Sequence, residues 1–240
     1  LYVYILGFNH NSAKEGNGIQ FGTFKTALSG GTDVCLVDGS YNSYKTDGSK
    51  IFNMNHWGNY NYGGWKACDL RYDILGSTNK APVNYGKARA TSDTGYDAPT
   101  NTATSPVANT LMAALPTDLR AVMKPITKYT DNKGNSSDVA ANVTSSLDYL
   151  PLLAEQEIFG GNRTYSNQYE KNSQVQYAYY SAGNSKVKYR HSATGSAAYW
   201  WERSPFYASG GYFFCFVNAN GNADADYAGG SFGLAPAFMV

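Results

Sequence analysis

Cysteine is scarce in this 240-residue sequence, and its distribution excludes several kinds of site. The three cysteines, Cys35, Cys68 and Cys215, are far apart and odd in number, and they form no CxxC pair. They therefore predict neither a disulfide framework nor a zinc site. We interpret them as buried thiols that pack as small apolar side chains.

Catalytic and metal-binding patterns are also missing. The three histidines, His10, His56 and His191, are scattered, and no HExxH, GxSxG or P-loop pattern occurs. Asp224 and Asp226 could offer oxygen atoms to calcium, but two carboxylates are far fewer than a good calcium site needs. We expect no enzymatic activity, no cofactor and no bound metal.

Neither clustered charge nor a long apolar run is present. Lysine and arginine number 19 against 18 acidic residues, without a basic cluster, so no nucleic-acid partner is indicated. No apolar run approaches the length that spans a bilayer, so we expect no membrane insertion. Because the first residue is Leu1 and not a methionine, we expect the chain to be the C-terminal part of a longer protein.

Tyrosine and glycine are abundant instead. The chain has 21 tyrosines and 25 glycines, a composition that favours short strands joined by loops over long helices. Its length fits one domain, 1–240, with a loop insertion near 77–109. The local patterns predict strands at 2–8, 19–24, 33–37 and 126–130, an apolar strand at the start of 147–159, helices at 63–76, 110–114 and 116–123, and a weak helix at 174–180.

The last forty residues carry the most specific pattern. WWERSP occupies 200–205, and FCxV, NxNGNAxAxxA and GLAPAF follow it between 214 and 238. This pattern resembles the C-type-lectin-fold variable proteins of diversity-generating retroelements, which are common in phages and bacteria of the gut. Upstream segments that resemble the same group are 53–55, 63–65, 115–116 and 155–160.

This resemblance implies an α+β chain with a C-type lectin fold, in which two helices pack on twisted antiparallel strands with many loops. It also implies a variable ligand-binding region near 200–238. The expected function is receptor binding or adhesion through diversified side chains on a fixed scaffold. The expected location is a phage virion, in a tail or surface structure, or a bacterial cell surface. The partner would be a protein or glycan on a host or bacterial surface, and the chain could form homo-oligomers.

The genetic code offers a check within this sequence. In such systems adenines of a template copy are replaced at random, and AAC codons then never become codons for Lys, Glu, Gln, Met or Trp. None of these residue types occurs between Phe206 and Phe232, although all of them occur elsewhere in the chain. Tyr, Phe, Ser, Gly and Asn dominate the segment, as they do in antibody loops.

We assign the residues of this region to two groups. The expected ligand-binding, variable positions are Phe206, Tyr207, Ser209, Gly210, Gly211, Tyr212, Phe216, Asn218, Ala219, Asn220, Asn222, Asp224, Asp226, Tyr227, Gly229, Gly230 and Phe232. The expected scaffold residues are Trp200, Trp201, Glu202, Arg203, Phe214, Cys215, Val217, Gly221, Leu234, Ala235 and Phe238. We expect Glu202 and Arg203 to form a buried ion pair beneath the surface.

Two alternatives remain open. The expected fold resembles that of formylglycine-generating enzymes, but those enzymes use two neighbouring cysteines in the C-terminal core, where this chain has only Cys215. A carbohydrate-binding domain without diversification is the second alternative. The EPN, QPD and WND motifs of calcium-dependent lectins do not occur here.

Overall fold

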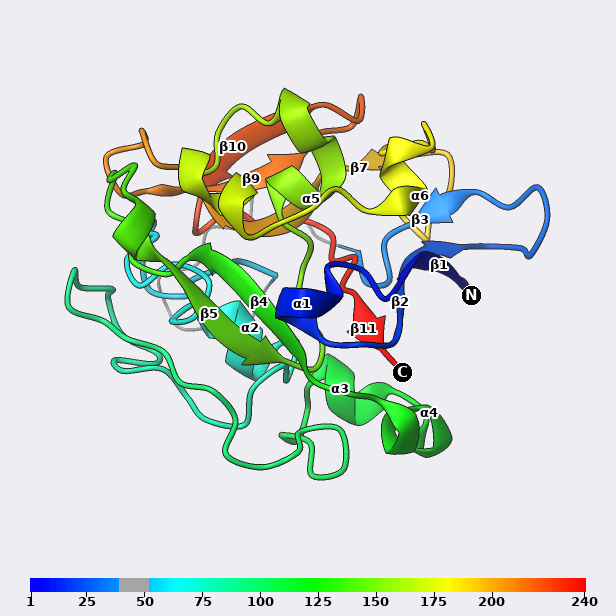
Figure 1. Cartoon of the computed structure of the whole chain (residues 1–240), viewed down its shortest axis with the longest axis horizontal. Coiled ribbons are helices and arrows are strands. Elements are labelled where there is room, and N and C mark those ends of the chain that lie inside the picture. The colour runs from blue at the N-terminus through cyan, green and yellow to red at the C-terminus, as the bar shows by residue number, and fades with distance from the viewer. Residues whose placement is uncertain (39–51) are drawn as a thin grey trace.

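The computed structural model describes residues 1–38 and 52–240, and in this part of the chain short strands form three sheets (Figure 1). The largest sheet has the order β1-β2-β3-β6-β7, and β11 also pairs with β2. A second sheet has the order β10-β9-β8, and β4 and β5 form a separate hairpin. The strands are β1 Tyr2–Phe8, β2 Ile19–Lys25, β3 Asp33–Val34, β4 Ile126–Asp131, β5 Val143–Asp148, β6 Lys188–Tyr189, β7 Ala197–Ala198, β8 Trp200–Pro205, β9 Phe213–Val217, β10 Ala223–Tyr227 and β11 Phe238–Met239.

The helices are all short. The α-helices are α1 Ser12–Glu15, α2 Asp69–Asp73, α3 Leu111–Ala114, α4 Thr117–Val122, α5 Glu155–Phe159 and α6 Ala178–Ser181, and the 3-10 helices are η1 Ala140–Asn142, η2 Gly160–Asn162 and η3 Gln168–Asn172. Helices of one or two turns are not stable alone in water, so packing against the sheets must hold them. None of the described helices is long and apolar enough to cross a bilayer.

The expected C-type lectin arrangement, with two helices packed on twisted antiparallel strands, is wrong. The chain is only loosely α+β: strands dominate, and the longest described α-helix, α4, has six residues. The strands are not all antiparallel either, because β3 pairs with β6 in parallel.

The helix expected at 63–76 is reduced to α2. Gly63 and Gly64 have positive φ angles of 78° and 55°, which a right-handed helix does not allow. Cys68 is extended, with ψ of 144°, so the helix begins only at Asp69. Trp65 and Leu75 are nevertheless buried, because turns around α2 bring them to the core.

Other expected elements differ mainly in length. The strands expected at 2–8, 19–24 and 126–130 appear as β1, β2 and β4, whereas 33–37 contains only the two-residue β3. The expected helices at 110–114 and 116–123 become α3 and α4, because Leu115 and Pro116 are extended between them. The apolar strand expected at the start of 147–159 is wrong, because only Leu147 and Asp148 lie in a strand, at the end of β5, and α5 follows after a stretch without strand. The weak helix at 174–180 is reduced to α6.

The segment 77–109 contains neither helix nor strand, but buried arginines fasten it to the core. Arg71 Nη1 donates to the Tyr96 carbonyl at 2.7 Å. Arg89 pairs with Asp69, and its Nη1 donates to the Val83 carbonyl at 2.7 Å. This loop is therefore anchored on its inner side at several points.

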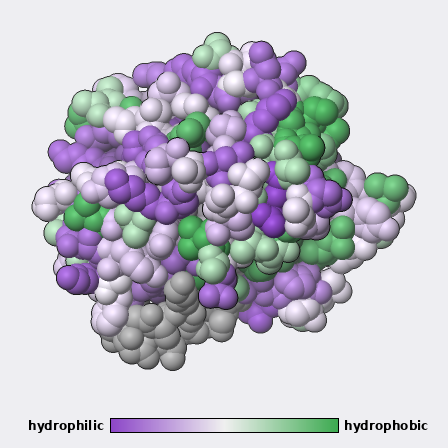
Figure 2. All heavy atoms as spheres, turned by 90° about the horizontal axis from the view of Figure 1, so that it is seen from below, coloured by the Kyte–Doolittle hydropathy of each residue, from purple (hydrophilic) through white to green (hydrophobic). Residues whose placement is uncertain are grey.

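The core consists of two apolar clusters, and β8 separates them. Successive side chains of a strand point to opposite faces. Trp201 accordingly packs in one cluster with Trp65, Phe214 and Phe238, whereas Trp200 packs in the other. On the face seen from below, apolar side chains lie in separate patches among polar ones (Figure 2).

A buried ion network joins α1, β4, α5 and β8. Arg203 of β8 makes two hydrogen bonds to Glu157 of α5, with Nη1–Oε2 at 2.5 Å and Nη2–Oε1 at 2.8 Å. Lys128 Nζ of β4 lies 2.9 Å from both Glu157 Oε1 and Glu15 Oε2, and Tyr177 Oη also lies 2.9 Å from it. Two cations thus face two carboxylates, so the buried charges balance.

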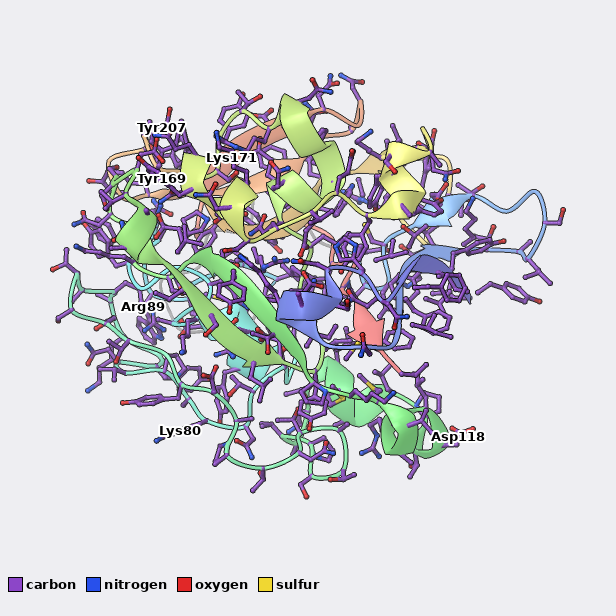
Figure 3. All side chains as sticks on the ribbon, in the orientation of Figure 1. Lys80, Arg89, Asp118, Tyr169, Lys171 and Tyr207 are labelled. Carbon is purple, nitrogen blue, oxygen red and sulfur yellow. The ribbon has the colours of Figure 1, made fainter. Side chains whose placement is uncertain are left out.

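Replacing Lys128 with methionine should lower the free energy of unfolding by about 3–5 kcal/mol, because Glu15 and Glu157 then lose their shared cation while they stay buried. Urea unfolding followed by tryptophan fluorescence measures this change. The control is Lys171→Met at an exposed lysine (Figure 3), which should stay within about 0.5 kcal/mol of the wild type. Equal effects of the two substitutions would show that the network is dispensable.

Candidate functional site

The sheet β8–β9–β10 builds the surface at which the sequence predicts binding. All residues of β8 are buried, and β9 is buried from Phe214 to Val217 because it lies between β8 and β10. At the free edge of the sheet, β10 has partly or fully exposed residues throughout. The loops at 206–212 and 218–222 extend from these strands, and Tyr207 lies at the outer edge of the molecule (Figure 3).

Most of the positions expected to be variable reach solvent. Those that are partly or fully exposed are Phe206, Tyr207, Ser209, Gly210, Tyr212, Asn218, Ala219, Asn220, Asn222, Asp224, Asp226, Tyr227 and Gly230. Of the tyrosines among them, Tyr227 is the most open, with 45% of its surface exposed.

Two phenylalanines that were expected on the ligand-binding surface are buried instead, so that expectation is wrong. Phe216 is 5% exposed and Phe232 is 2% exposed. Their ring centroids lie 4.7 Å apart, and the Phe232 centroid lies 4.3 Å from that of Trp201. Both rings therefore form the apolar layer beneath the surface and are not displayed on it.

The expectation also fails for two glycines. Gly229 is buried in the turn after β10. Gly211 is buried with a φ of 86°, and a Cβ atom there would lie 2.6 Å from Tyr62 Cε1. A side chain at position 211 would thus be strained both by its backbone and by its neighbour.

The residues expected in the scaffold are buried, apart from Gly221, which is partly exposed in the hairpin turn between β9 and β10. The buried ones are Trp200, Trp201, Glu202, Arg203, Phe214, Cys215, Val217, Leu234, Ala235 and Phe238. The indole Nε1 of Trp200 donates to the Lys186 carbonyl at 3.0 Å, and that of Trp201 donates to the Phe52 carbonyl at 2.8 Å.

The expected ion pair between Glu202 and Arg203 is wrong, because neighbouring residues of a strand point to opposite faces. Arg203 pairs with Glu157 instead. Both carboxylate oxygens of Glu202 are buried and have no hydrogen-bond partner among the described residues. Burial, together with the charges of Glu155 and Glu170, raises the pKa of Glu202 well above its ordinary value, so the site favours the neutral form of this carboxyl.

A continuous group of rings covers the outer side of this sheet, and we call it the aromatic surface. It consists of Tyr60, Tyr62, Tyr165, Phe206, Tyr207, Tyr212, Phe213 and Tyr227, all of them partly or fully exposed. Each ring has a neighbour in the group within 6.4 Å between centroids. The surface thus combines segments that are far apart in the sequence.

Tyr60, Tyr62 and Tyr165 were not expected at this surface. The Tyr60 ring stacks on that of Tyr62 at 4.7 Å and on that of Tyr212 at 5.0 Å. The segment Asn59-Tyr60-Asn61-Tyr62-Gly63 shares the Tyr, Asn and Gly composition of the variable stretch. That likeness was the one signal in the sequence that could have found it.

Buried Asn61 fixes the position of the aromatic surface. Its Nδ2 donates to the Phe213 carbonyl at 2.8 Å, and its Oδ1 accepts from the Asn135 amide at 2.9 Å. Its backbone amide donates to the Gly211 carbonyl at 2.8 Å. One side chain thereby ties the start of β9 to the loop after β4, so the rings lie on a fixed backbone.

One described group of side chains has the spacing of a metal site, but it already holds a cation. Ligand atoms of His10, Glu15 and Glu157 lie within 4.8 Å of one another. Lys128 Nζ, however, lies 2.9 Å from a carboxylate oxygen of each glutamate. Its positive charge neutralises the carboxylates and would repel a metal ion.

The three thiols and two of the three histidines, His10 and His56, are buried. All three cysteines are buried, and desolvation raises the pKa of Cys35 to about 12 and that of Cys215 well above its ordinary value. His10 stacks on Tyr177 at 3.9 Å between ring centroids. His56 lies buried, with Nδ1 2.9 Å from Asn53 Oδ1. These contacts give no described cysteine the exposed, activated thiolate that thiol chemistry requires.

Comparison with known proteins gives one match. The family described as "Domain of unknown function (DUF6273)" matches residues 41–240. No curated protein and no solved structure matches the chain.

The free energy of unfolding of the wild type should fall as the pH rises from 4.5 to about 7. Replacing Glu170 with glutamine should reduce this fall. Burial raises the pKa of Glu170 from 4.5 to about 7, so over this range the folded protein keeps a proton that the unfolded chain releases. The contribution of this group is therefore fully present below pH 4.5 and lost as the pH rises through 7. The loss amounts to about 2–4 kcal/mol, at roughly 1.4 kcal/mol per pKa unit.

Urea unfolding of wild type and Glu170→Gln across this pH range measures the difference between their free energies of unfolding. Asp118→Asn, at an exposed carboxylate (Figure 3), controls for the removal of one acidic group and should leave the difference from wild type constant. A constant difference for Glu170→Gln as well would contradict the assigned cause.

Proposed function

Because the chain belongs to the family described as a domain of unknown function (DUF6273), its role must be inferred from its own surface, and we propose that it is a ligand-binding module. The aromatic surface carries this proposal. Large exposed aromatic groups on a rigid support mark binding sites, because they bury much area on contact and lose little side-chain entropy. Asn61 and the central strand β9 provide the support.

We further propose that the exposed positions between Phe206 and Gly230 are diversified by a retroelement, while the buried ones are fixed. The absence of Lys, Glu, Gln, Met and Trp from this segment supports the idea. The arrangement supports it too, because substitutions at solvent-facing loop positions usually change stability by less than about 0.5 kcal/mol. In this proposal the exposed side chains determine which ligand binds, and the buried Phe214, Cys215 and Val217 hold the backbone in place.

The partner in this proposal is a protein or glycan on a host or bacterial surface, and the chain serves as a receptor-binding or adhesive part of a phage virion or cell surface. Side chains of the aromatic surface suit either partner, since tyrosine rings stack on apolar faces and their hydroxyl groups form hydrogen bonds. No observation among the described residues favours an oxidase, because Cys215 is buried with a raised pKa.

Tyr212→Ala and Tyr227→Ala should each weaken ligand binding by about tenfold or more, as losses of central aromatic contacts do. Arrays of glycans and of bacterial surface proteins, probed with the labelled full chain, identify the ligand and give its apparent affinity. The matched control is Tyr2→Ala on β1, because Tyr2 is 47% exposed against 45% for Tyr227. Binding that survives both substitutions at the aromatic surface would place the contact elsewhere.

Diversification makes a separate prediction about genes. Copies of this locus from related genomes should differ mainly at the exposed positions between Phe206 and Gly230, and a near-identical template repeat with a reverse transcriptase gene should lie nearby. The six-residue strands β4 and β5 serve as the internal control and should differ little. Differences spread evenly over the chain would refute diversification but leave ligand binding intact.

A further inference from the structure

A small hollow lies between β7 and the turn that follows β9. It has a volume of about 230 Å³ and is lined by Arg190, Ala197, Ala198, Tyr199, Ala219, Ser231 and Phe232. Arg190 directly follows β6, and the other residues come from β7 and the position after it, from the turn after β9 and from the segment before β11. The volume lies below the usual range for drug-sized ligands, so a molecule with a single ring is the largest that fits.

Arg190 is the only charged residue in this lining. It forms no ion pair within the described part of the chain, and its Nε atom is buried without a hydrogen-bond partner there. Asp38 is engaged by the two residues that follow Arg190 in the chain: it accepts from the His191 and Ser192 amides and lies 3.2 Å from His191 Nδ1.

Apart from Ser231, the rest of the lining consists of alanines and aromatic rings. The side chains of Tyr199 and Phe232 have ring centroids 5.6 Å apart at an interplanar angle of 82°. Alanines at 197, 198 and 219 leave room beside these rings. Such walls suit the flat face of a six-membered ring.

From these features we propose that the hollow binds a small carboxylate carried on a six-membered ring. The guanidinium group of Arg190 pairs with the carboxylate, whose two oxygen atoms match its planar set of donors. The ring packs against Tyr199 and Phe232. A single positive charge suits a carboxylate better than a doubly charged phosphate.

This inference does not depend on diversification or on a surface receptor. Arg190, the segment Ala197–Tyr199, Ser231 and Phe232 lie outside the stretch proposed to vary, and only Ala219 comes from it. The charged end of the site therefore belongs to the fixed part of the chain, while the exposed Ala219 side of the lining could tune the fit of the ring.

Titration of the full chain, followed by NMR chemical shifts and calorimetry, tests the proposal with benzoate as an aromatic acid and glucuronate as a sugar acid. At least one of them should bind with a dissociation constant on the order of millimolar or tighter, as small ligands do. Its neutral counterpart, benzamide or glucose, should bind at least about tenfold more weakly, because it lacks the charge-assisted hydrogen bonds. Which acid binds distinguishes an aromatic from a sugar ligand.

Arg190→Met should weaken carboxylate binding by about tenfold to a hundredfold, and Arg190→Lys should retain part of it. Ala219→Leu fills the hollow from a partly exposed turn and should abolish binding even if Arg190→Met does not fold. Arg163→Met, at another half-buried arginine, is the control and should bind like wild type.

The inference is overturned if neither acid binds, if the neutral compounds bind equally well, or if affinity survives both Arg190→Met and Ala219→Leu. These outcomes leave the array experiment untouched, because that experiment reads binding at Tyr212 and Tyr227, which do not line the hollow.

Discussion

The pairing of Arg203 with Glu157, shared with Lys128, is the interaction on which the arrangement of the layers depends. Arg203 comes from the sheet that carries the aromatic surface, Glu157 from α5 and Lys128 from the β4–β5 hairpin. Buried charges tolerate few alternative neighbours, because an unpaired charge in the interior is far costlier than a misplaced apolar group. The network therefore determines how the three layers meet, while the tryptophans on either face of β8 supply most of the apolar contact.

The sheet β8–β9–β10 thereby combines buried residues that fix its backbone with exposed residues that can be replaced. The central strand β9 is buried between its neighbours, and Asn61 holds its first residue from outside. Side chains beyond this frame reach solvent, where substitutions usually change stability little. Phe216 and Phe232 belong to the frame, because each lies within a buried stretch of the sequence.

The sequence allowed the strands with continuous β-branched and aromatic residues to be predicted, as β1, β2 and β4 show. It also located most of the exposed positions after β8. The failures have specific causes. Periodicity at Trp65, Cys68 and Leu75 suggested a long helix, but the positive φ angles of two glycines before Trp65 override that pattern.

Contacts that depend on the tertiary fold were harder to predict from the sequence. Glu202 and Arg203 were expected to pair because they are adjacent in the sequence, although a strand directs them apart. Tyr60 and Tyr62 join the aromatic surface through turns that no local pattern encodes, and the hollow at Arg190 draws on separate segments. The pairing of β2 with β11 belongs to the same class: Phe21 lies opposite Phe238, and Gln20 opposite Met239. During synthesis on the ribosome, β2 pairs with β11 only after nearly the whole chain has been made, so the largest sheet is completed late. Until then the unpaired edge of β2 stays open to chaperone binding.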